Sequence, residues 1–148
     1  MKLLDIMKRV ELFRGLDEAQ LERIADLSTQ ETYTQEAKIF NQGDSGDKMY
    51  IISDGQVEVR VRGSDGSSRA AVYLGIGQVF GEMALIDSGP RSAGVFAVDD
   101  TTVIYSIPTD DFTELCRTDT GIGYIMMRNI AQDLSFKLRH RDFDPSQG

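Results

Sequence analysis

The sequence has only one cysteine and one histidine in 148 residues. A single thiol, Cys116, cannot build a disulfide framework or a thiolate metal cluster, so we interpret it as a small apolar residue in a reducing cytosol. The one imidazole, His140, lies near the C-terminal end and cannot supply the several histidine and carboxylate ligands of a metal centre inside a barrel. The sequence therefore predicts no metal site and no cofactor.

Long apolar runs are also absent. No stretch of about 18 consecutive apolar residues occurs, and the N-terminal residues MKLLDIMKRVELF carry charges throughout, unlike a signal peptide. We therefore expect a cytoplasmic protein without membrane insertion, while attachment to a membrane partner stays open.

Positive charge is scarce, because 16 lysines and arginines face 24 aspartates and glutamates and the formal net charge is −8. A broad nucleic-acid-binding face needs clustered basic residues that displace counterions from phosphates. We therefore predict no direct contact with nucleic acid. One small anion in a local pocket remains compatible with this charge.

Signatures of catalysis are missing too. The sequence contains no nucleophile motif, no Walker-type phosphate loop and no paired carboxylates that suggest nucleotide hydrolysis. We therefore predict that the protein is not an enzyme. Its length corresponds to about one domain with a core of its own, so we expect residues 1–148 to form a single domain.

Residues 1–28 have apolar residues at mainly helical spacings. A first short helix is predicted over Leu4 to Phe13. Asp17 can cap a second helix, with Gln20 three residues later as its partner in a capping box, and this helix should run to about Leu27.

Residues 29–108 change to short runs of β-forming residues punctuated by glycine, which is typical of an all-β region. The alternation of Val57, Val59 and Val61 with charged residues predicts one core face and one solvated face. Seven or more short strands with such turns favour a sandwich or a jelly roll, and of these we expect a double-stranded β-helix, or jelly roll, of about eight strands. Candidate strands are Glu31 to Thr34, Lys38 to Asn41, Met49 to Ser53, Gln56 to Arg62, Arg69 to Leu74, Ser92 to Ala97 and Val103 to Ile107.

Residues 109–141 return to helical spacing. Thr109 is placed to cap a helix that buries Phe112 and Leu115. A longer helix should run from Gly121 to about Arg141, with an inward stripe formed by Ile122, Met126, Ile130, Leu134 and Leu138. Residues 142–148 are expected to be a disordered tail.

The stretch FGEMALIDSGPRSAGV, residues 80–95, combines several groups suited to phosphate. Gly81 can cap a short helix that begins at Glu82, whose free N–H groups attract an anion. Arg91 follows a Gly-Pro break and offers forked donors for two phosphate oxygens, and Ser92 adds a hydroxyl. Glu82 would repel a phosphate unless the ligand also presents hydroxyls, as a phosphorylated sugar does.

This stretch resembles the phosphate-binding cassette of cyclic nucleotide-binding domains, FGE-x-AL followed by PR-[AST]-A. The resemblance implies that Glu82 holds the ribose 2′-hydroxyl and that Arg91 neutralises the cyclic phosphate. By the same match, the phosphate shell is completed by Gly81, Met83, Ala84, Ser92 and Ala93. Val72, Leu74 and Met127 are candidate contacts to the base. Gly94 departs from the family, in which a larger residue such as threonine is usual.

A second run supports the resemblance. Gly43-Asp44, Tyr50-Ile51-Ile52 and the segment from Asp54 to Val59 are similar to the G-D-x5-[YF]-I-I-x2-G-x-V-x-V pattern of the same family. Alone this run indicates only a β-roll, because glycines and aliphatic strands recur in many barrels. With the cassette and the flanking helices, the resemblance covers nearly the whole chain.

The resemblance implies a receptor for a cyclic purine nucleotide. Ser92 occupies the position where alanine or serine accompanies cAMP in many relatives and threonine often accompanies cGMP, so cAMP is favoured and cGMP stays open. In the family the C-terminal helix closes over the base, and in some members it pairs two subunits. Simple packing of this helix on the barrel is an equally weighted alternative.

Other functions remain open at this point. Without the family, an arginine after a Gly-Pro turn is usually a solvated surface residue, and a degenerate domain kept as an interaction scaffold is an alternative. A transcription factor of the catabolite activator type needs a recognition helix in a further module. The given sequence has no such module after the long helix. If it is the full gene product, we expect a stand-alone module that acts through a homodimer or an effector protein; if it is part of a longer protein, an effector domain is the alternative.

Overall fold

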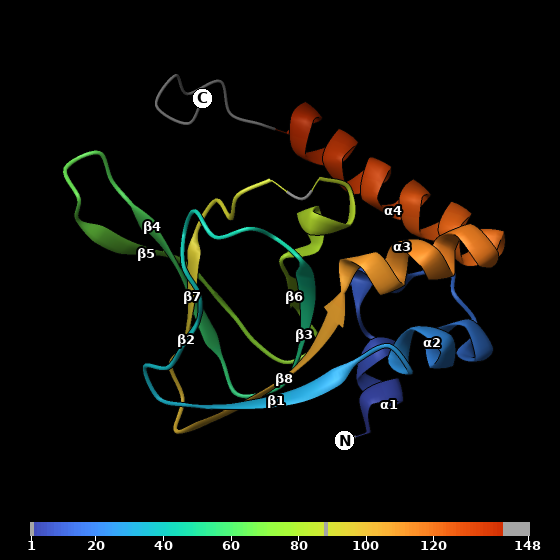
Figure 1. Ribbon diagram of the computed structural model, residues 1–148, viewed down its shortest axis with the longest axis horizontal. Helices are drawn as coiled ribbons and strands as arrows, with labels where there is room; N and C mark the ends of the chain where they lie inside the picture. The colour runs from blue at the N-terminus through green and yellow to red at the C-terminus, as the bar shows by residue number, and fades with distance from the viewer. Residues whose placement is uncertain (1, 88, 141–148) are drawn as a thin grey trace.

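The computed structural model describes residues 2–87 and 89–140. Helices gather at one end of the molecule and two β-sheets form the other end (Figure 1). The N-terminal helices are α1 (Leu3–Met7), the single 3₁₀ turn η1 (Glu11–Phe13) and α2 (Glu18–Ala25), and the C-terminal helices are α3 (Thr109–Thr118) and α4 (Thr120–Arg139). None of the helices in these described ranges has the length and apolar character needed to cross a bilayer.

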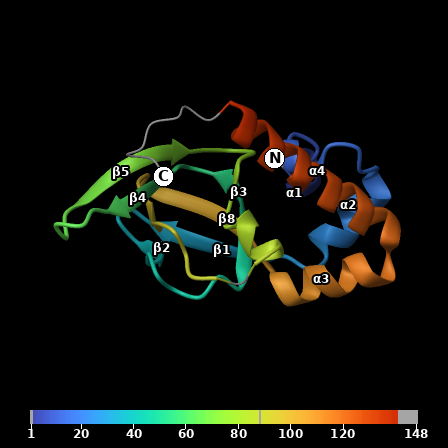
Figure 2. The same cartoon turned by 90° about the horizontal axis from the view of Figure 1, so that it is seen from above.

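The described residues form eight strands in two four-stranded antiparallel sheets. One sheet has the order β1-β8-β3-β6 and the other the order β2-β7-β4-β5, and Figure 2 shows the β4-β5 hairpin pointing away from the helices. This arrangement confirms the predicted jelly roll with flanking helices. The strands are β1 (Thr29–Thr34), β2 (Lys38–Phe40), β3 (Lys48–Asp54), β4 (Val57–Arg62), β5 (Ser68–Leu74), β6 (Val79–Phe80), β7 (Gly94–Ala97) and β8 (Thr101–Pro108).

The middle of strand β3, Met49–Ile52, is buried on both faces, which explains why four large, mainly apolar residues follow one another there. Met49 and Ile51 pack into a cluster that includes the helices, whereas Tyr50 and Ile52 point into the interior of the β-roll. Successive side chains of a strand point to opposite faces, so the part of β3 that lies between the helical layer and the β-roll interior has large, mainly apolar side chains on both faces. β3 therefore joins the two hydrophobic clusters.

Hydrogen bonds and an ion pair connect the N-terminal segment to the middle of α4. The Asn129 side chain is only 3% exposed and donates two hydrogen bonds of 2.8 Å, to the carbonyl oxygens of Leu12 and Arg14. The Arg14 guanidinium donates in turn to Gln132 at 3.0 Å and pairs with Asp133 at 3.1 Å. These contacts join segments more than a hundred residues apart, so the two ends of the described chain pack as one layer.

The helix starts were predicted with mixed success. Asp17 caps α2 as expected: its side chain accepts from the Gln20 N–H at 2.8 Å, and the Asp17 N–H donates to the Gln20 side chain at 2.9 Å. The prediction that Thr109 caps α3 was wrong. Thr109 is already helical, and its hydroxyl donates to the Asp47 carbonyl oxygen, which ties α3 to the turn before β3.

The predicted continuous helix from Leu4 to Phe13 was also wrong, because the chain breaks between α1 and η1. In one straight helix Leu12 would point away from the face shared by Ile6, Val10 and Phe13. The break lets Leu12 enter the same buried cluster as these residues. Burial of one more large side chain therefore explains the interruption.

The inward stripe of α4 is shorter than expected. Ile122, Met126 and Ile130 are buried and Leu134 packs at the edge of the core, but Leu138 is 68% exposed. The prediction for Leu138 was wrong because the last turns of α4 extend past the other helices (Figure 1). The expected disordered tail, residues 142–148, lies outside the described residues.

Candidate functional site

A cavity of about 530 Å³ opens between the β-roll, the 3₁₀ turn η2 (Glu82–Leu85) and the end of α4. Its volume lies in the range of small-molecule sites. Every residue of the predicted cassette lines it, together with two of the three predicted base contacts. These lining residues are Gly81, Glu82, Met83, Ala84, Arg91, Ser92 and Ala93 from the cassette, and Val72 and Leu74 from β5.

The third predicted base contact, Met127, does not reach this cavity. It lies on α4 and lines a separate pocket of about 360 Å³ with Leu85, Cys116 and Tyr124. Gly94, the position at which the sequence departs from the family pattern, does not line the cavity either. Gly94 is buried at the start of β7, and a Cβ atom there would lie 3.1 Å from the ring of Phe96. The structure therefore brings neither residue to the site.

The position of η2 is set by Gly81, the residue before it, and by Ala84 and Leu85 at its end. Gly81 has φ of 75°, a left-handed conformation that glycine adopts at little cost, and it turns the chain from β6 into η2. Ala84 and Leu85 are buried, and Leu85 packs into the cluster shared with the helices. The cassette helix begins at Glu82 as predicted, but it is a single 3₁₀ turn.

The loop that carries Arg91 is held by the glycine-rich segment before β3. The Arg91 N–H donates to the Asp44 carbonyl oxygen at 2.7 Å, and the Gly43 N–H donates to the Arg91 carbonyl oxygen at 2.8 Å. Ser45 and Pro90 form an isolated antiparallel bridge. The two sequence runs identified above are thus neighbours, and the Gly43-Asp44 run holds the backbone of the cassette at Arg91.

The side chain of Arg91 is buried without a counter-charge. It is 8% exposed and donates only to backbone carbonyl oxygens, from Nη2 to Lys48 at 2.7 Å and from Nη1 to Gly81 at 3.5 Å. Among the described residues no carboxylate lies within ion-pair distance of this guanidinium, and its buried Nε has no hydrogen-bond partner. The alternative of a solvated surface arginine is therefore wrong.

A buried, uncompensated guanidinium is unfavourable unless something else completes its shell. Burial raises the pKa of the neighbouring Tyr50, and the positive charge of Arg91 partly offsets this. A free N–H donor and a full positive charge beside a cavity are suited to an anion.

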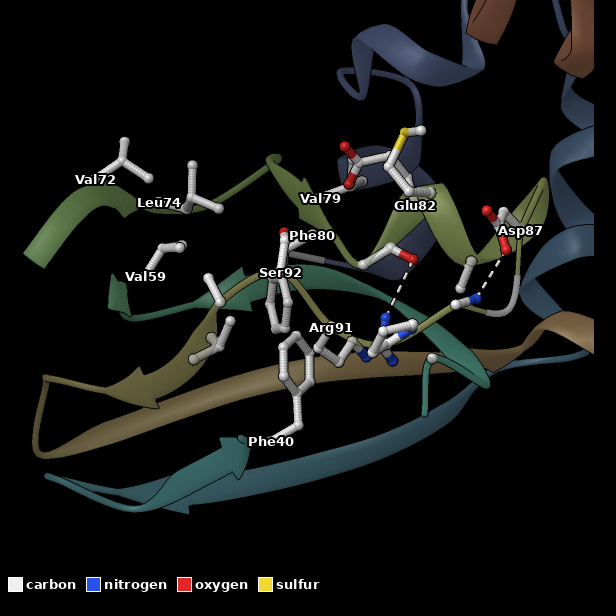
Figure 3. Close-up of a pocket in the computed structure, with 18 of the residues that line it drawn as sticks. Phe40, Val59, Val72, Leu74, Val79, Phe80, Glu82, Asp87, Arg91 and Ser92 are labelled. Atoms are coloured by element: carbon white, nitrogen blue, oxygen red, sulfur yellow. Dashed lines mark hydrogen bonds between the residues drawn. The ribbon is translucent and has the colours of Figure 1, made fainter. Parts of the chain in front are cut away.

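The cavity has an apolar end and a polar end. Val59, Val72 and Leu74 group at one end and Glu82 and Asp87 at the other, as Figure 3 shows. Asp87 accepts from the Gly89 N–H at 2.9 Å. This separation suits a ligand that has an apolar flat part and a polar part bearing hydroxyls and an anion. In the described part of the chain no three histidine, cysteine or acidic side chains come together to hold a metal ion.

Phe40, Asp87 and Lys137 also line the cavity, and the sequence analysis assigned a ligand contact to none of them. Lys137 is exposed near the C-terminal end of α4. It lies seven residues after Ile130, on the same side of the helix, and this spacing could have indicated it. No local signal pointed to Phe40, which reaches the cavity from β2.

Comparisons with known proteins agree with this geometry. The family model described as "Cyclic nucleotide-binding domain" matches residues 30–119. The cyclic AMP receptor protein of Thermus thermophilus is 33% identical over 138 residues, which cover 93% of this chain and 62% of that protein. The cAMP-dependent protein kinase type II regulatory subunit of Drosophila melanogaster is 31% identical over 126 residues, 85% of this chain and 32% of that subunit.

A solved structure shows the same architecture. The catabolite activator protein of Thermus thermophilus superimposes with a TM-score of 0.80 at 31% identity, covering 93% of this chain and 62% of that one. The present chain thus spans less than two thirds of the length of these relatives. The matched family model, the two-sheet β-roll and the cassette around a buried arginine lead to one conclusion: the chain belongs to the family of cyclic nucleotide-binding domains.

Proposed function

We propose that this chain is a cytoplasmic receptor module for a cyclic purine nucleotide, that it prefers cAMP to cGMP, and that it signals without catalysing a reaction. The observation that carries the proposal is the buried Arg91, whose Nε lacks a partner among the described residues. A cyclic phosphate would supply both the missing acceptor and the missing negative charge. The names of the two curated relatives, a cyclic AMP receptor and a cAMP-dependent kinase subunit, support the same class of ligand.

The polar end of the cavity suits the sugar and phosphate. Arg91 would bind the phosphate, and Glu82 would accept a hydrogen bond from the ribose 2′-hydroxyl. The backbone of Gly81, Met83 and Ala84 borders the same space, and so do Ser92 and Ala93. These groups would complete the phosphate shell.

The apolar end of the cavity suits the base. Val72 and Leu74 of β5 border this end, and Val72 is 46% exposed without a ligand. Covering this surface with a purine would remove apolar area from water. Ser92 favours adenine by the family pattern, and a guanine-binding module is the alternative, because a serine hydroxyl can both donate and accept.

Signalling would pass through α4. Lys137 brings this helix to the wall of the cavity, so a bound nucleotide contacts the β-roll and the helix at once. A ligand shifts such a helix only if it binds its two positions with different affinity, and a difference of about 1 to 3 kcal/mol is ordinary. Without such a difference the domain would serve only as an interaction scaffold.

A second surface of α4 is suited to contact with another protein chain. Tyr124, Met127 and Leu138 are exposed large apolar side chains, and with Ala131 and Leu134 they recur at alternating spacings of three and four residues. That spacing is typical of helices that pair. We propose that this stripe contacts a second copy of the chain or an effector protein, and sedimentation of the wild type against Leu138→Glu tests the pairing of copies.

Titration calorimetry with cAMP and cGMP tests the ligand proposal. We expect binding of both nucleotides with cAMP the tighter, and a loss of about 100-fold in Arg91→Ala, because charged hydrogen bonds contribute about 1.5 to 3 kcal/mol each. Glu82→Gln, which keeps the shape of the side chain, should weaken binding less. Arg69→Ala is the matched control, since Arg69 is exposed on β5 and does not line the cavity.

Either of two results would contradict the proposal. One is unchanged affinity in a folded Arg91→Ala protein. The other is a folded wild-type protein that binds neither nucleotide, which would favour the scaffold alternative.

A further inference from the structure

The guanidinium of Arg91 rests on an aromatic ring. Its Cζ atom lies 4.2 Å from the centroid of the Phe40 ring and 5.8 Å from that of Tyr50. Figure 3 shows the Phe40 ring directly beside Arg91 at the floor of the cavity. Both distances fall within the reach of a cation–π interaction, and the shorter one is a close contact.

The ring beneath Arg91 is fixed by two other rings. Phe40 packs against Tyr50 and Phe80 at centroid distances of 5.8 and 5.9 Å, and Tyr50 stacks on Phe80 at 4.8 Å. Tyr50 and Phe80 are buried within the β-roll, with Phe40 packed against their cluster. We call Phe40, Tyr50 and Phe80 the aromatic platform. Three rings packed in this way have little freedom to turn, so the surface offered to Arg91 is rigid.

An aromatic ring holds an arginine differently from a carboxylate. A carboxylate accepts two of the N–H groups at the edge of the guanidinium and cancels its charge. A ring contacts the face of the guanidinium and leaves the edge donors and the charge intact. No carboxylate of the described residues lies within ion-pair distance of Arg91. Among the described side chains, the aromatic platform is therefore what supports the guanidinium.

We propose that Phe40, supported by Tyr50 and Phe80, is a positioning residue that holds Arg91 in place for an anionic phosphate ligand without using the donors that the ligand needs. The proposal deepens the proposed function and rests on it. The two backbone carbonyls of Lys48 and Gly81 fix the far side of the guanidinium, and the ring fixes its plane. Neither support takes up the buried Nε–H, which has no partner among the described residues.

Fluorination of the ring tests this directly, because it weakens the negative face of an aromatic ring while largely preserving its shape. Phe40 would be replaced by phenylalanine analogues carrying one, two and three fluorine atoms, and cAMP affinity measured by calorimetry. We expect a stepwise loss that reaches about 3- to 10-fold, the size expected when one long side chain must be ordered on binding. Phe40→Leu, which removes the ring, should lose at least as much.

Phe96 provides a matched control. Its ring carries the Arg60 guanidinium at 4.1 Å, the same interaction at nearly the same distance, and it does not line the cavity. The same fluorine series at Phe96 should leave cAMP affinity unchanged. Affinity that is unchanged across the Phe40 series, or that rises with fluorine content, would overturn the proposal, and a rise would mean that the ring competes with the ligand for Arg91.

A measurement without nucleotide separates this inference from the proposed function. In the unliganded protein, the NMR signal of the Arg91 Nε–H should move toward the position of exposed arginines in Phe40→Leu and stay in place in Phe96→Leu. If the wild type binds no cyclic nucleotide but the signal behaves in this way, the proposed function fails and the platform stands. If the signal does not respond to Phe40→Leu, the platform fails whatever the wild type binds.

Discussion

Gly81 offers a sharp test of how the cavity is built. A Cβ atom at this position would lie 2.8 Å from Nη1 of Arg91 and 3.0 Å from the carbonyl oxygen of Lys48. The residue also has φ of 75°. Gly81→Ala therefore combines two costs, the left-handed backbone and a collision with the guanidinium that we assign to ligand binding.

The magnitude of each cost follows from its origin. A left-handed conformation costs a residue with a Cβ about 1 to 2 kcal/mol. The collision must push Arg91 off the Lys48 carbonyl, to which it donates at 2.7 Å, and loss of a charged hydrogen bond costs about 1.5 to 3 kcal/mol. Together these effects should lower the free energy of unfolding by about 2.5 to 5 kcal/mol.

The variant Gly77→Ala distinguishes the cost of the left-handed backbone from the cost of the collision. Gly77 has nearly the same backbone conformation, with φ of 82°, but the nearest atom to an added Cβ is 4.0 Å away on Arg9. Gly77→Ala should therefore lose only the backbone contribution of about 1 to 2 kcal/mol.

Urea unfolding and calorimetry with cAMP measure both variants. We expect Gly81→Ala to be the less stable variant and to lose at least about 10-fold in affinity, since a displaced Arg91 gives up part of its charged contact. Gly77→Ala should bind as the wild type does. Equal losses of stability in the two variants, or full affinity in Gly81→Ala, would refute the reasoning that Gly81 exists to make room for Arg91.

Three further predictions concern the scaffold. Asn129→Leu leaves the carbonyls of Leu12 and Arg14 without their buried donor, so urea unfolding should show a loss of about 2 to 4 kcal/mol, and an unchanged midpoint would mean that water replaces the amide. Asp17→Ala removes the cap of α2 and should cost about 1 kcal/mol in the same assay, whereas no loss would show that the cap contributes little. Burial raises the pKa of the Cys116 thiol, so iodoacetamide should alkylate it more slowly than free cysteine near pH 8, and its rate should still be rising with pH where free cysteine, half thiolate at about pH 8.5, begins to level off. A rate equal to that of free cysteine would contradict this.

The β-roll could be predicted because its signals are local. Alternating valines and frequent glycines mark strands and turns wherever the chain is inspected. Strand β6 was missed because two residues, Val79 and Phe80, are too few to show any alternation. The break before η1 was missed for another reason: it depends on which cluster buries Leu12, and spacing along one helix does not carry that information.

The site was predictable to the extent that its residues are neighbours in sequence. Gly81, Glu82 and Arg91 lie within one short stretch, so a single motif indicated them together. Phe40 and Lys137 come from the second strand and the last helix, and only the folded chain brings them to the cavity. The burial of Arg91 was likewise hidden, because a Gly-Pro turn gives no sign of the rings on which the next side chain rests.

The contact between the two ends of the chain has a consequence for how this domain can be divided. The family match covers residues 30–119, yet Met49, Ile51 and Ile107 within it are fully buried against helices that include α1, α2 and α4. A fragment cut at those limits would leave this face of the sheet in water and would lack both Asn129 and its two carbonyl partners. The limits of the family match are therefore narrower than the unit that folds, which needs the helices on both sides.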